Sequence, residues 1–246
     1  MAAVPPFDPT QLPGDVTLDH VVPAREPEFA PLPADLRPEL AEALAGRGIE
    51  RLYSHQADAY VHVRAGRHLV VVTPTASGKS LCYNLPVLQR LLERPSSRAL
   101  YLFPTKALAQ DQLAELGALT APLPLDVRVS TYDGDTPPGQ RTAVREGGHI
   151  VLTNPDMLHT GVLPHHTRWR KLFSSLEHVV IDELHTYRGL FGSQVANVIR
   201  RLKRICRHYG SAPQFIMASA TIANPRELAE RLTGETVSEV SESGAP

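Results

Sequence analysis

The segment TPTASGKS, residues 73–80, has the composition of a loop that binds phosphate groups. The apolar run LVVV precedes it and the amphipathic run SLCYNLPVL follows, so the loop joins a strand to the N-terminus of a helix, where backbone N–H groups form an anion cradle. Gly78 permits close approach of phosphates, Lys79 reaches the β- and γ-phosphates, and the Ser80 hydroxyl suits Mg²⁺. Thr73 replaces the first glycine of the general pattern, and a chance Gly-Lys-Ser at an ordinary helix start is the alternative. The predicted nucleotide contacts are Thr73, Pro74, Thr75, Ala76, Ser77, Gly78, Lys79 and Ser80.

Two adjacent carboxylates follow the apolar run of HVVIDELH, residues 178–185. They fall at the carboxyl end of a strand, where ligands bind in open α/β sheets. Asp182 is suited to hold Mg²⁺ opposite Ser80, and Glu183 is suited to orient and deprotonate an attacking water. A solvated strand end is the alternative for an isolated Asp-Glu pair. Downstream of a phosphate loop, the pair indicates nucleoside-triphosphate hydrolysis with Glu183, Asp182 and Lys79 as catalytic residues.

A third polar segment, MASAT at 217–221, also follows an apolar run. Taken alone, this segment is interpreted as a plain turn after the strand; hydrogen bonds from the hydroxyls of Ser219 and Thr221 back to Asp182 or His185 are the alternative.

Short apolar runs that alternate with amphipathic stretches must position these residues. The runs are HLVVV (68–72), RALYLF (98–103), DVRVS (126–130), HIVLT (149–153), HVVID (178–182) and QFIMAS (214–219). Alternation of strands and helices predicts an α/β fold with a mostly parallel central sheet flanked by helices. Residues 1–37 are rich in proline and are expected to form an extended arm. Two helical segments follow from residue 38, and residues 241–246 are expected to be a flexible tail.

Composition bounds the class of protein. The hydrophobic fraction is 42% and the charged fraction 21%, which is ordinary for a globular protein. Cys82 and Cys206 form no CxxC pair, which argues against a disulfide framework or a cysteine zinc site. The first residues lack a basic and an apolar region, and no apolar run reaches the length of a membrane helix, so we expect a cytoplasmic protein, associated with the nucleoid if the source is bacterial.

The net charge of −1, from 25 basic and 26 acidic side chains, does not favour a nucleic-acid partner and does not exclude one. The basic run RRLKRICRH (200–208) is interpreted as a solvated helix face, with a nucleic-acid patch as the alternative.

The chain resembles superfamily 2 helicases of the DExH type. TPTASGKS, FPTKALAQ, TNPDML, DELH and SAT occur in the order and approximate spacing of motifs I, Ia, Ib, II and III of that family, over roughly residues 38–235. More narrowly, LYSHQ, YLFPTKALAQDQ and HTYRGLFGS are similar to the mitomycin-repair-factor branch, which is related to RecQ-like DNA-repair helicases.

The resemblance implies a RecA-like domain over 38–240 and roles that spacing alone does not give. Gln56 would contact adenine, with Tyr53 stacking nearby. His185 and the motif III residues Ser219, Ala220 and Thr221 would couple the nucleotide site to the rest of the motor. The loops expected to hold a nucleic-acid backbone are Pro104, Thr105 and Lys106 of motif Ia and Thr153, Asn154, Pro155 and Asp156 of motif Ib. The YDGDT segment (132–136) is expected to support the same track or to form a plain turn.

We therefore expect an ATP- and Mg²⁺-dependent DNA helicase domain acting in DNA repair, with single-stranded DNA as partner. An RNA remodeller and a non-catalytic nucleotide-binding module are the alternatives. Nothing after residue 221 supplies the later helicase motifs, so a second RecA-like domain is expected as a partner and the chain alone is expected to be weakly active.

Overall fold

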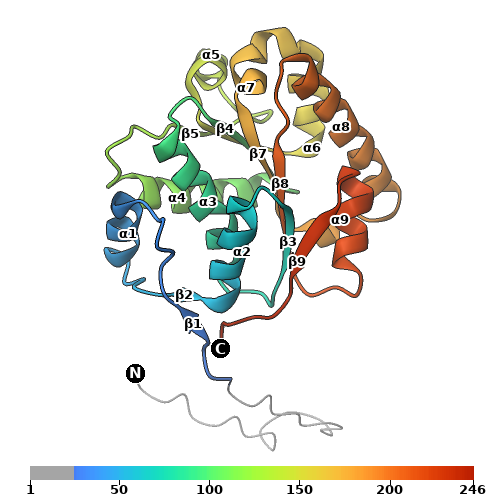
Figure 1. The fold of residues 1–246 in the computed structure, drawn as a ribbon. Coiled ribbons are helices and arrows are strands. Elements are labelled where there is room, and N and C mark those ends of the chain that lie inside the picture. Colours follow the sequence, from blue (N-terminus) through green and yellow to red (C-terminus); the bar gives the residue numbers. More distant parts are fainter. Residues whose placement is uncertain (1–24) are drawn as a thin grey trace, which may run out of the picture.

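A seven-stranded sheet, in which every pair of neighbouring strands is parallel, organises residues 25–246, the part that this computed structural model describes. Its strand order is β5-β6-β4-β7-β8-β3-β9 (Figure 1). The strands in chain order are β3 (His68–Val72), β4 (Arg98–Leu102), β5 (Val129–Thr131), β6 (Ile150–Thr153), β7 (Leu176–Ile181), β8 (Gln214–Ser219) and β9 (Val237–Val240). The predicted parallel α/β fold is confirmed, and β3 and β8 have the predicted bounds.

Helices cover both faces of the sheet (Figure 1). One face carries α1 (Pro38–Ala45), α2 (Ser54–Arg64), α3 (Lys79–Glu93) and α4 (Lys106–Thr120). The other carries α5 (Pro138–Gly147), α6 (Pro155–Met157), the helical turns η2 (Leu158–Val162) and η3 (Leu163–Trp169), α7 (Arg170–Ser174), α8 (Gly189–His208) and α9 (Pro225–Thr233). A further turn, η4 (Leu184–Thr186), follows β7.

The apolar runs of the strands explain this two-sided burial, because successive side chains of a strand point to opposite faces. In β3, Leu69 and Val71 belong to the cluster under α1–α4, whereas Val70 and Val72 belong to the cluster under α5–α9. All four are buried. Continuous apolar runs, rather than alternating ones, are therefore what the sheet requires.

The segments at the two ends of the described chain lie against α2. The strands β1 (Phe29–Ala30) and β2 (Leu52–Tyr53) form an antiparallel pair, and Gly244 hydrogen-bonds to Glu28. Ser243 and Ala245 are buried, so residues 243–245 are packed, which differs from the flexible tail expected for 241–246. Residues 1–24 of the predicted proline-rich arm (1–37) lie outside the part of the chain that the structure describes.

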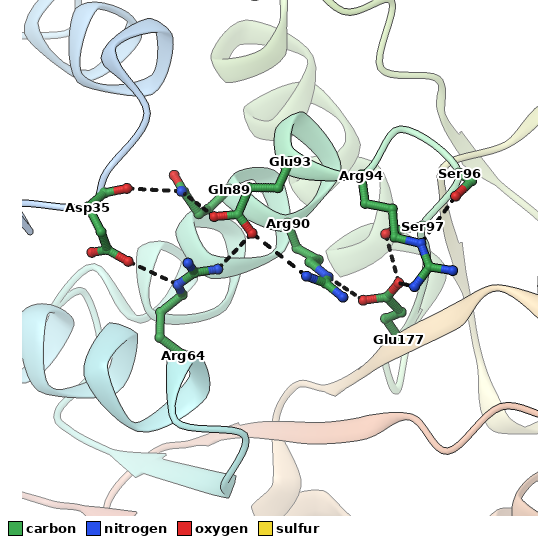
Figure 2. A network of polar contacts seen from close by, with 9 residues as sticks. All are labelled: Asp35, Arg64, Gln89, Arg90, Glu93, Arg94, Ser96, Ser97 and Glu177. Carbon is green, nitrogen blue, oxygen red and sulfur yellow. Dashed lines mark hydrogen bonds and ion pairs between the residues drawn. The ribbon is translucent and has the colours of Figure 1, made fainter.

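A polar network fixes α2 and α3 at the amino-terminal edge of the sheet (Figure 2). Arg64 of α2 donates to Asp35 (3.1 Å) and to Glu93 (2.8 Å). Arg90 of α3 pairs with Glu177 of β7, which accepts a second hydrogen bond from Arg94 at 2.9 Å. The network lies away from the carboxyl-terminal strand ends and stabilises the position of α3, the helix that follows the phosphate loop. No helix in residues 25–246 is both long and apolar enough to cross a membrane.

Candidate nucleotide site

The loop between β3 and α3 has the backbone shape that the sequence predicted. Gly78 adopts the left-handed conformation (φ 75°) and precedes the first residue of α3. A Cβ atom at this position would lie 2.7 Å from Nε2 of Gln56, so any other residue would displace the Gln56 amide and would also strain the left-handed backbone. Ala76 is also left-handed (φ 63°), which is a strained conformation for a residue with a side chain. The loop therefore leads directly into the N-terminus of α3, where backbone N–H groups can form an anion cradle.

Lys79 lies across its own loop. Its Nζ atom donates to the backbone oxygens of Thr73 (3.0 Å) and Pro74 (2.7 Å). Burial lowers the pKa of Lys79, and the nearby carboxylates of Glu183 and Asp182 act in the opposite direction. The ammonium group therefore already lies in the field of the acidic pair.

The hydroxyls of the loop are engaged within the protein. Thr73 Oγ1 and Ser77 Oγ are 2.6 Å apart and buried, so these side chains hold the loop closed. Ser80 Oγ donates to Glu115 of α4 at 2.9 Å and not to Asp182. Pro74, Thr75 and Ala76 are exposed at the tip of the loop.

Asp182 and Glu183 follow β7 directly. The carboxylate of Asp182 accepts hydrogen bonds from the Tyr83 hydroxyl (3.0 Å) and from the backbone N–H of Glu183 (2.8 Å). Burial raises the pKa of Asp182 to about 6, although both hydrogen bonds oppose the rise. Glu183 has left-handed backbone angles (φ 51°, ψ 45°). Strain of this kind in a non-glycine residue is concentrated at functional sites.

The loop and the acidic pair lie at one edge of the sheet. β8 pairs with β3 on one side and with β7 on the other, and all three run in the same direction. Their carboxyl ends therefore lie side by side, in the middle of the carboxyl-terminal edge of the sheet, where a ligand bound by Lys79 would face Asp182. The upward influence of both carboxylates on the pKa of Lys79 agrees with this placement.

The residues of LYSHQ connect α2 to the loop. Gln56 is buried; its Nε2 donates to Gly78 O (3.0 Å) and its Oε1 accepts from Tyr53 N (3.0 Å), so both ends of the expected adenine-binding amide are occupied by backbone groups. Tyr53 stacks on Phe29 and on His55, with ring centroids 5.2 Å and 5.8 Å apart.

Motif III and His185 do not form the hydrogen bonds that the sequence allowed. Ser219 Oγ donates to the backbone oxygen of Ala220 (2.8 Å), so it does not reach Asp182. His185 Nδ1 lies 3.2 Å from Glu183 Oε2 and forms no hydrogen bond with any described residue. Thr221 is exposed.

The motif Ia loop and the YDGDT segment lie together. Thr105 caps α4 by accepting a hydrogen bond from Leu108 N (3.3 Å). Lys106 is half-exposed and forms an ion pair with Asp135 of YDGDT. Pro104 precedes them at the end of β4.

The motif Ib residues divide into buried and exposed members. Thr153 is only 2% exposed and its hydroxyl donates to Tyr132 O (2.6 Å), so this side chain is engaged within the protein rather than presented at the surface of the loop. Asn154 caps α6 through Met157 N (2.8 Å). Pro155 is buried, and Asp156 is exposed in the first turn of α6.

Three residues at the site were not predicted. Tyr83 holds Asp182, Glu115 holds Ser80, and the ring of His55 joins Ser77 O (3.1 Å) to Gly244 N (3.2 Å). Tyr83 and Glu115 lie in amphipathic helices, where nothing in the local sequence distinguishes them from packing or surface residues. His55 stands beside Gln56 in LYSHQ, and that proximity was the available signal.

A parallel sheet with a glycine-lysine loop after one strand and an acidic pair after a neighbouring strand defines a RecA-like nucleotide-binding domain. Comparison with known families is consistent with this class. Residues 53–228 match the DEAD/DEAH box helicase family, and the chain belongs to that family.

Similar proteins cover nearly the whole chain. The uncharacterized ATP-dependent helicase YprA of Bacillus subtilis is 58% identical over 227 residues, which is 92% of this chain and 30% of that protein. The ATP-dependent helicase HRQ1 of Saccharomyces cerevisiae is 42% identical over 230 residues, which is 92% of this chain and 21% of that protein. A crystal structure of the DUF1998 helicase MrfA superposes with a TM-score of 0.89 at 59% identity, over 90% of this chain and 31% of that one. The chain thus spans a fifth to a third of the length of these relatives.

Proposed function

We propose that the chain is the ATP-binding motor domain of a cytoplasmic DNA helicase that couples ATP hydrolysis to strand translocation and unwinding. The observation that carries the proposal is the meeting of the Gly78–Lys79 loop and the Asp182–Glu183 pair at one sheet edge. The similar MrfA structure is of that protein bound to DNA and AMPPNP, which supports DNA and a nucleoside triphosphate as ligands here.

Residues 38–240 would form the domain, and a second RecA-like domain would be its partner. On the resemblance of LYSHQ and HTYRGLFGS to the mitomycin-repair-factor branch, we assign the protein to DNA repair. Sensitivity of a deletion strain to mitomycin C tests that assignment, and a strain as resistant as its parent would remove it.

The residues present fit the triphosphate. A side chain at Gly78 would meet the Gln56 amide, and the backbone N–H groups of the loop and Lys79 would offset negative charge on the phosphates. A Mg²⁺ ion held by Asp182 and Ser80 would neutralise further charge on the phosphates. Ser80 would have to turn from Glu115 to take part.

The reaction needs a base beside the γ-phosphate. Glu183 is half-buried, follows the better-buried Asp182, and is near enough to Lys79 to raise the pKa of that ammonium group. Glu183 would orient a water in line with the phosphate and take its proton, while Lys79 holds the charge that develops. Asp182, which accepts a hydrogen bond from Tyr83, would hold the metal rather than take the proton.

Glu183→Gln in the whole protein tests this mechanism. We expect ATP hydrolysis to fall by about 10²–10⁴-fold, because the general base is lost, while ATP binding is retained. Glu227→Gln, which removes an exposed carboxylate paired with Arg231, is the matched control and should leave hydrolysis unchanged. If the Glu183→Gln protein hydrolysed ATP at the parent rate, the proposed catalytic role of this site would be wrong. The alternative of a non-catalytic nucleotide-binding module would then remain.

Stimulation of the ATPase by single-stranded DNA and by RNA of the same length decides between the DNA helicase and the RNA remodeller. We expect DNA to stimulate more strongly. Stronger stimulation by RNA would overturn the assignment to DNA.

A further inference from the structure

Helix α8 concentrates positive charge in a chain whose net charge is −1. It contains no aspartate or glutamate from Gly189 to His208. Four arginines lie in its second half, at positions that recur on the outer side of the helix; we refer to them as the α8 arginine stripe. They are Arg200, Arg201, Arg204 and Arg207.

The stripe has no acidic partner in the described part of the chain. No carboxylate of residues 25–246 forms an ion pair with any of its arginines, whereas Arg64, Arg90 and Arg94 are all paired. The neighbouring basic residue, Lys203, pairs with Glu235. Within the stripe, Arg200 donates to Asn197 at 2.7 Å, which leaves its charge uncompensated. A solvated helix face normally interleaves both signs of charge, so this surface differs from the face that the sequence predicted.

A groove of about 990 Å³ runs over the stripe and reaches motif Ib. Arg200, Arg201, Arg204 and Arg207 line it, together with Pro155 and Asp156 of the motif Ib loop. Phe191, whose ring is 39% exposed, lines it as well. The groove is therefore continuous with one of the two loops assigned to the nucleic-acid backbone.

The spacing of the charges suits a phosphate backbone. Arg200, Arg204 and Arg207 follow one another along one side of α8 with a rise of about 4.5–6 Å between neighbours, from 1.5 Å per residue. Regularly spaced arginines bind successive phosphates without reading the bases. An exposed aromatic ring beside them is the kind of group on which unpaired bases stack.

We propose that the α8 arginine stripe binds the phosphates of a single DNA strand beyond the motif Ib loop and so lengthens the strand track of the domain. This inference rests on the proposed function, since it continues the path assigned to motifs Ia and Ib. A single DNA strand is the more suitable occupant than an acidic protein segment, because the groove is continuous with the motif Ib loop to which the strand path is assigned and contains the exposed ring of Phe191, on which a base can stack.

Binding of fluorescent oligodeoxythymidylates to the 246-residue chain tests the inference. Their length is increased over the roughly 4–16 nucleotides of a single-strand site, and each affinity is measured over a range of salt concentrations. For the longest strands, replacing both Arg204 and Arg207 by glutamine should reduce the slope of log K against log salt by about 1.4, since each phosphate contact on a single strand contributes about 0.7. For the shortest strands the same variant should bind like the parent.

Two comparisons make the result specific. The double variant Arg47→Gln, Arg67→Gln removes two exposed arginines that line no part of the groove, and it should leave the slope unchanged at every length. Lys106→Ala, in motif Ia, should weaken binding of short and long strands alike. Thermal unfolding of each variant shows whether it is folded.

Each remaining outcome overturns a defined statement. If the Arg204, Arg207 variant has the parent slope at all lengths while Lys106→Ala weakens binding, the inference fails and the proposed function stands. If the stripe instead binds poly-glutamate, with DNA affinity unaffected by the substitutions, its partner is an acidic protein and the inference also fails. If the parent chain binds no strand of any length, the assignment of motifs Ia and Ib fails together with the inference.

Discussion

At the scale of single residues, the site depends on a few atoms whose partners are already set. Gly78 combines a left-handed backbone with a close approach to Gln56, Lys79 donates to its own loop, and Asp182 accepts a hydrogen bond from Tyr83. Buried hydrogen bonds of this kind fix side-chain direction, which matters because a carboxylate and an ammonium act on phosphate only within contact distance.

Gly78→Ala should abolish nucleotide binding. The new Cβ would lie 2.7 Å from Gln56 Nε2, and the left-handed backbone would cost about 1–2 kcal/mol for alanine. Gly66→Ala is the matched control, because Gly66 has nearly the same φ (76°) and no atom within 4 Å of its Cβ position. We expect both variants to lose similar stability in urea unfolding and only Gly78→Ala to lose binding of a fluorescent ATP analogue. Equal binding by the two variants would show that the close approach at Gly78 is irrelevant.

Tyr83→Phe should weaken binding of the nucleotide only in the presence of Mg²⁺. Without the phenol, Asp182 loses one of its two hydrogen-bond donors, worth about 1 kcal/mol or about fivefold in affinity. Tyr101→Phe is the control, since it removes a buried hydroxyl that donates to Asn84 (3.1 Å) and does not touch Asp182. Calorimetric titration of both variants, with Mg²⁺ and with EDTA, separates the effects. An equal loss with EDTA would show that Tyr83 only supports packing.

At the scale of elements, the sequence predicts the strands that have continuous apolar runs, but it does not predict which strands pair with one another. β3 and β8 have the predicted bounds because burial on both faces selects apolar residues throughout. β5 begins three residues later than DVRVS and is only Val129–Thr131, because it is an edge strand with one neighbour. The short pair β1–β2 was missed, since its pairing joins segments that are distant in the chain. The chemistry at strand ends could be read locally, whereas Tyr83 and Glu115 reach the site only through the packing of α3 and α4.

Strand β7 carries a titratable group that ties stability to pH. Burial lowers the pKa of His178 to about 4, with Arg90 and Arg64 acting in the same direction and Glu177 opposing. Because the folded pKa lies below the unfolded value of about 6.5, the stability that neutral His178 confers is complete above pH 6.5 and is lost as pH falls toward 4. The loss is on the order of 3 kcal/mol.

His178→Gln should therefore flatten the pH dependence of the free energy of unfolding. Urea titrations at about pH 7 and about pH 5 should show a smaller decrease for this variant than for the parent. His165→Gln, at an exposed position, should decrease as the parent does. If His178→Gln and the parent lose the same stability between the two pH values, the pKa of His178 does not differ between the folded and unfolded states.

At the scale of the whole molecule, the described residues supply the phosphate loop and the acidic pair of the proposed site. In residues 25–246 no arginine forms a hydrogen bond or ion pair with the loop at 73–80 or with the acidic pair. The relatives are three to five times longer than the matched segment, so groups from elsewhere in such a protein can reach this edge of the sheet. If a group from a second domain stabilises the transition state, as we propose, binding by the loop and the rate of hydrolysis should be separable.

The 246-residue chain should consequently bind ATP weakly and hydrolyse it slowly. An arginine that stabilises charge in the transition state is worth about 10³-fold or more in phosphoryl transfer, so kcat of the isolated chain should be at least about 10³-fold below that of the whole protein. Single-stranded DNA should raise the rate of the whole protein and leave that of the isolated chain nearly unchanged, because strand binding acts through the relative position of two domains. Steady-state phosphate release by both proteins, each with Glu183→Gln as the background control, measures the difference. Strong DNA-stimulated turnover by the isolated chain would mean that Lys79, Asp182 and Glu183 suffice and that no group from a second domain is needed.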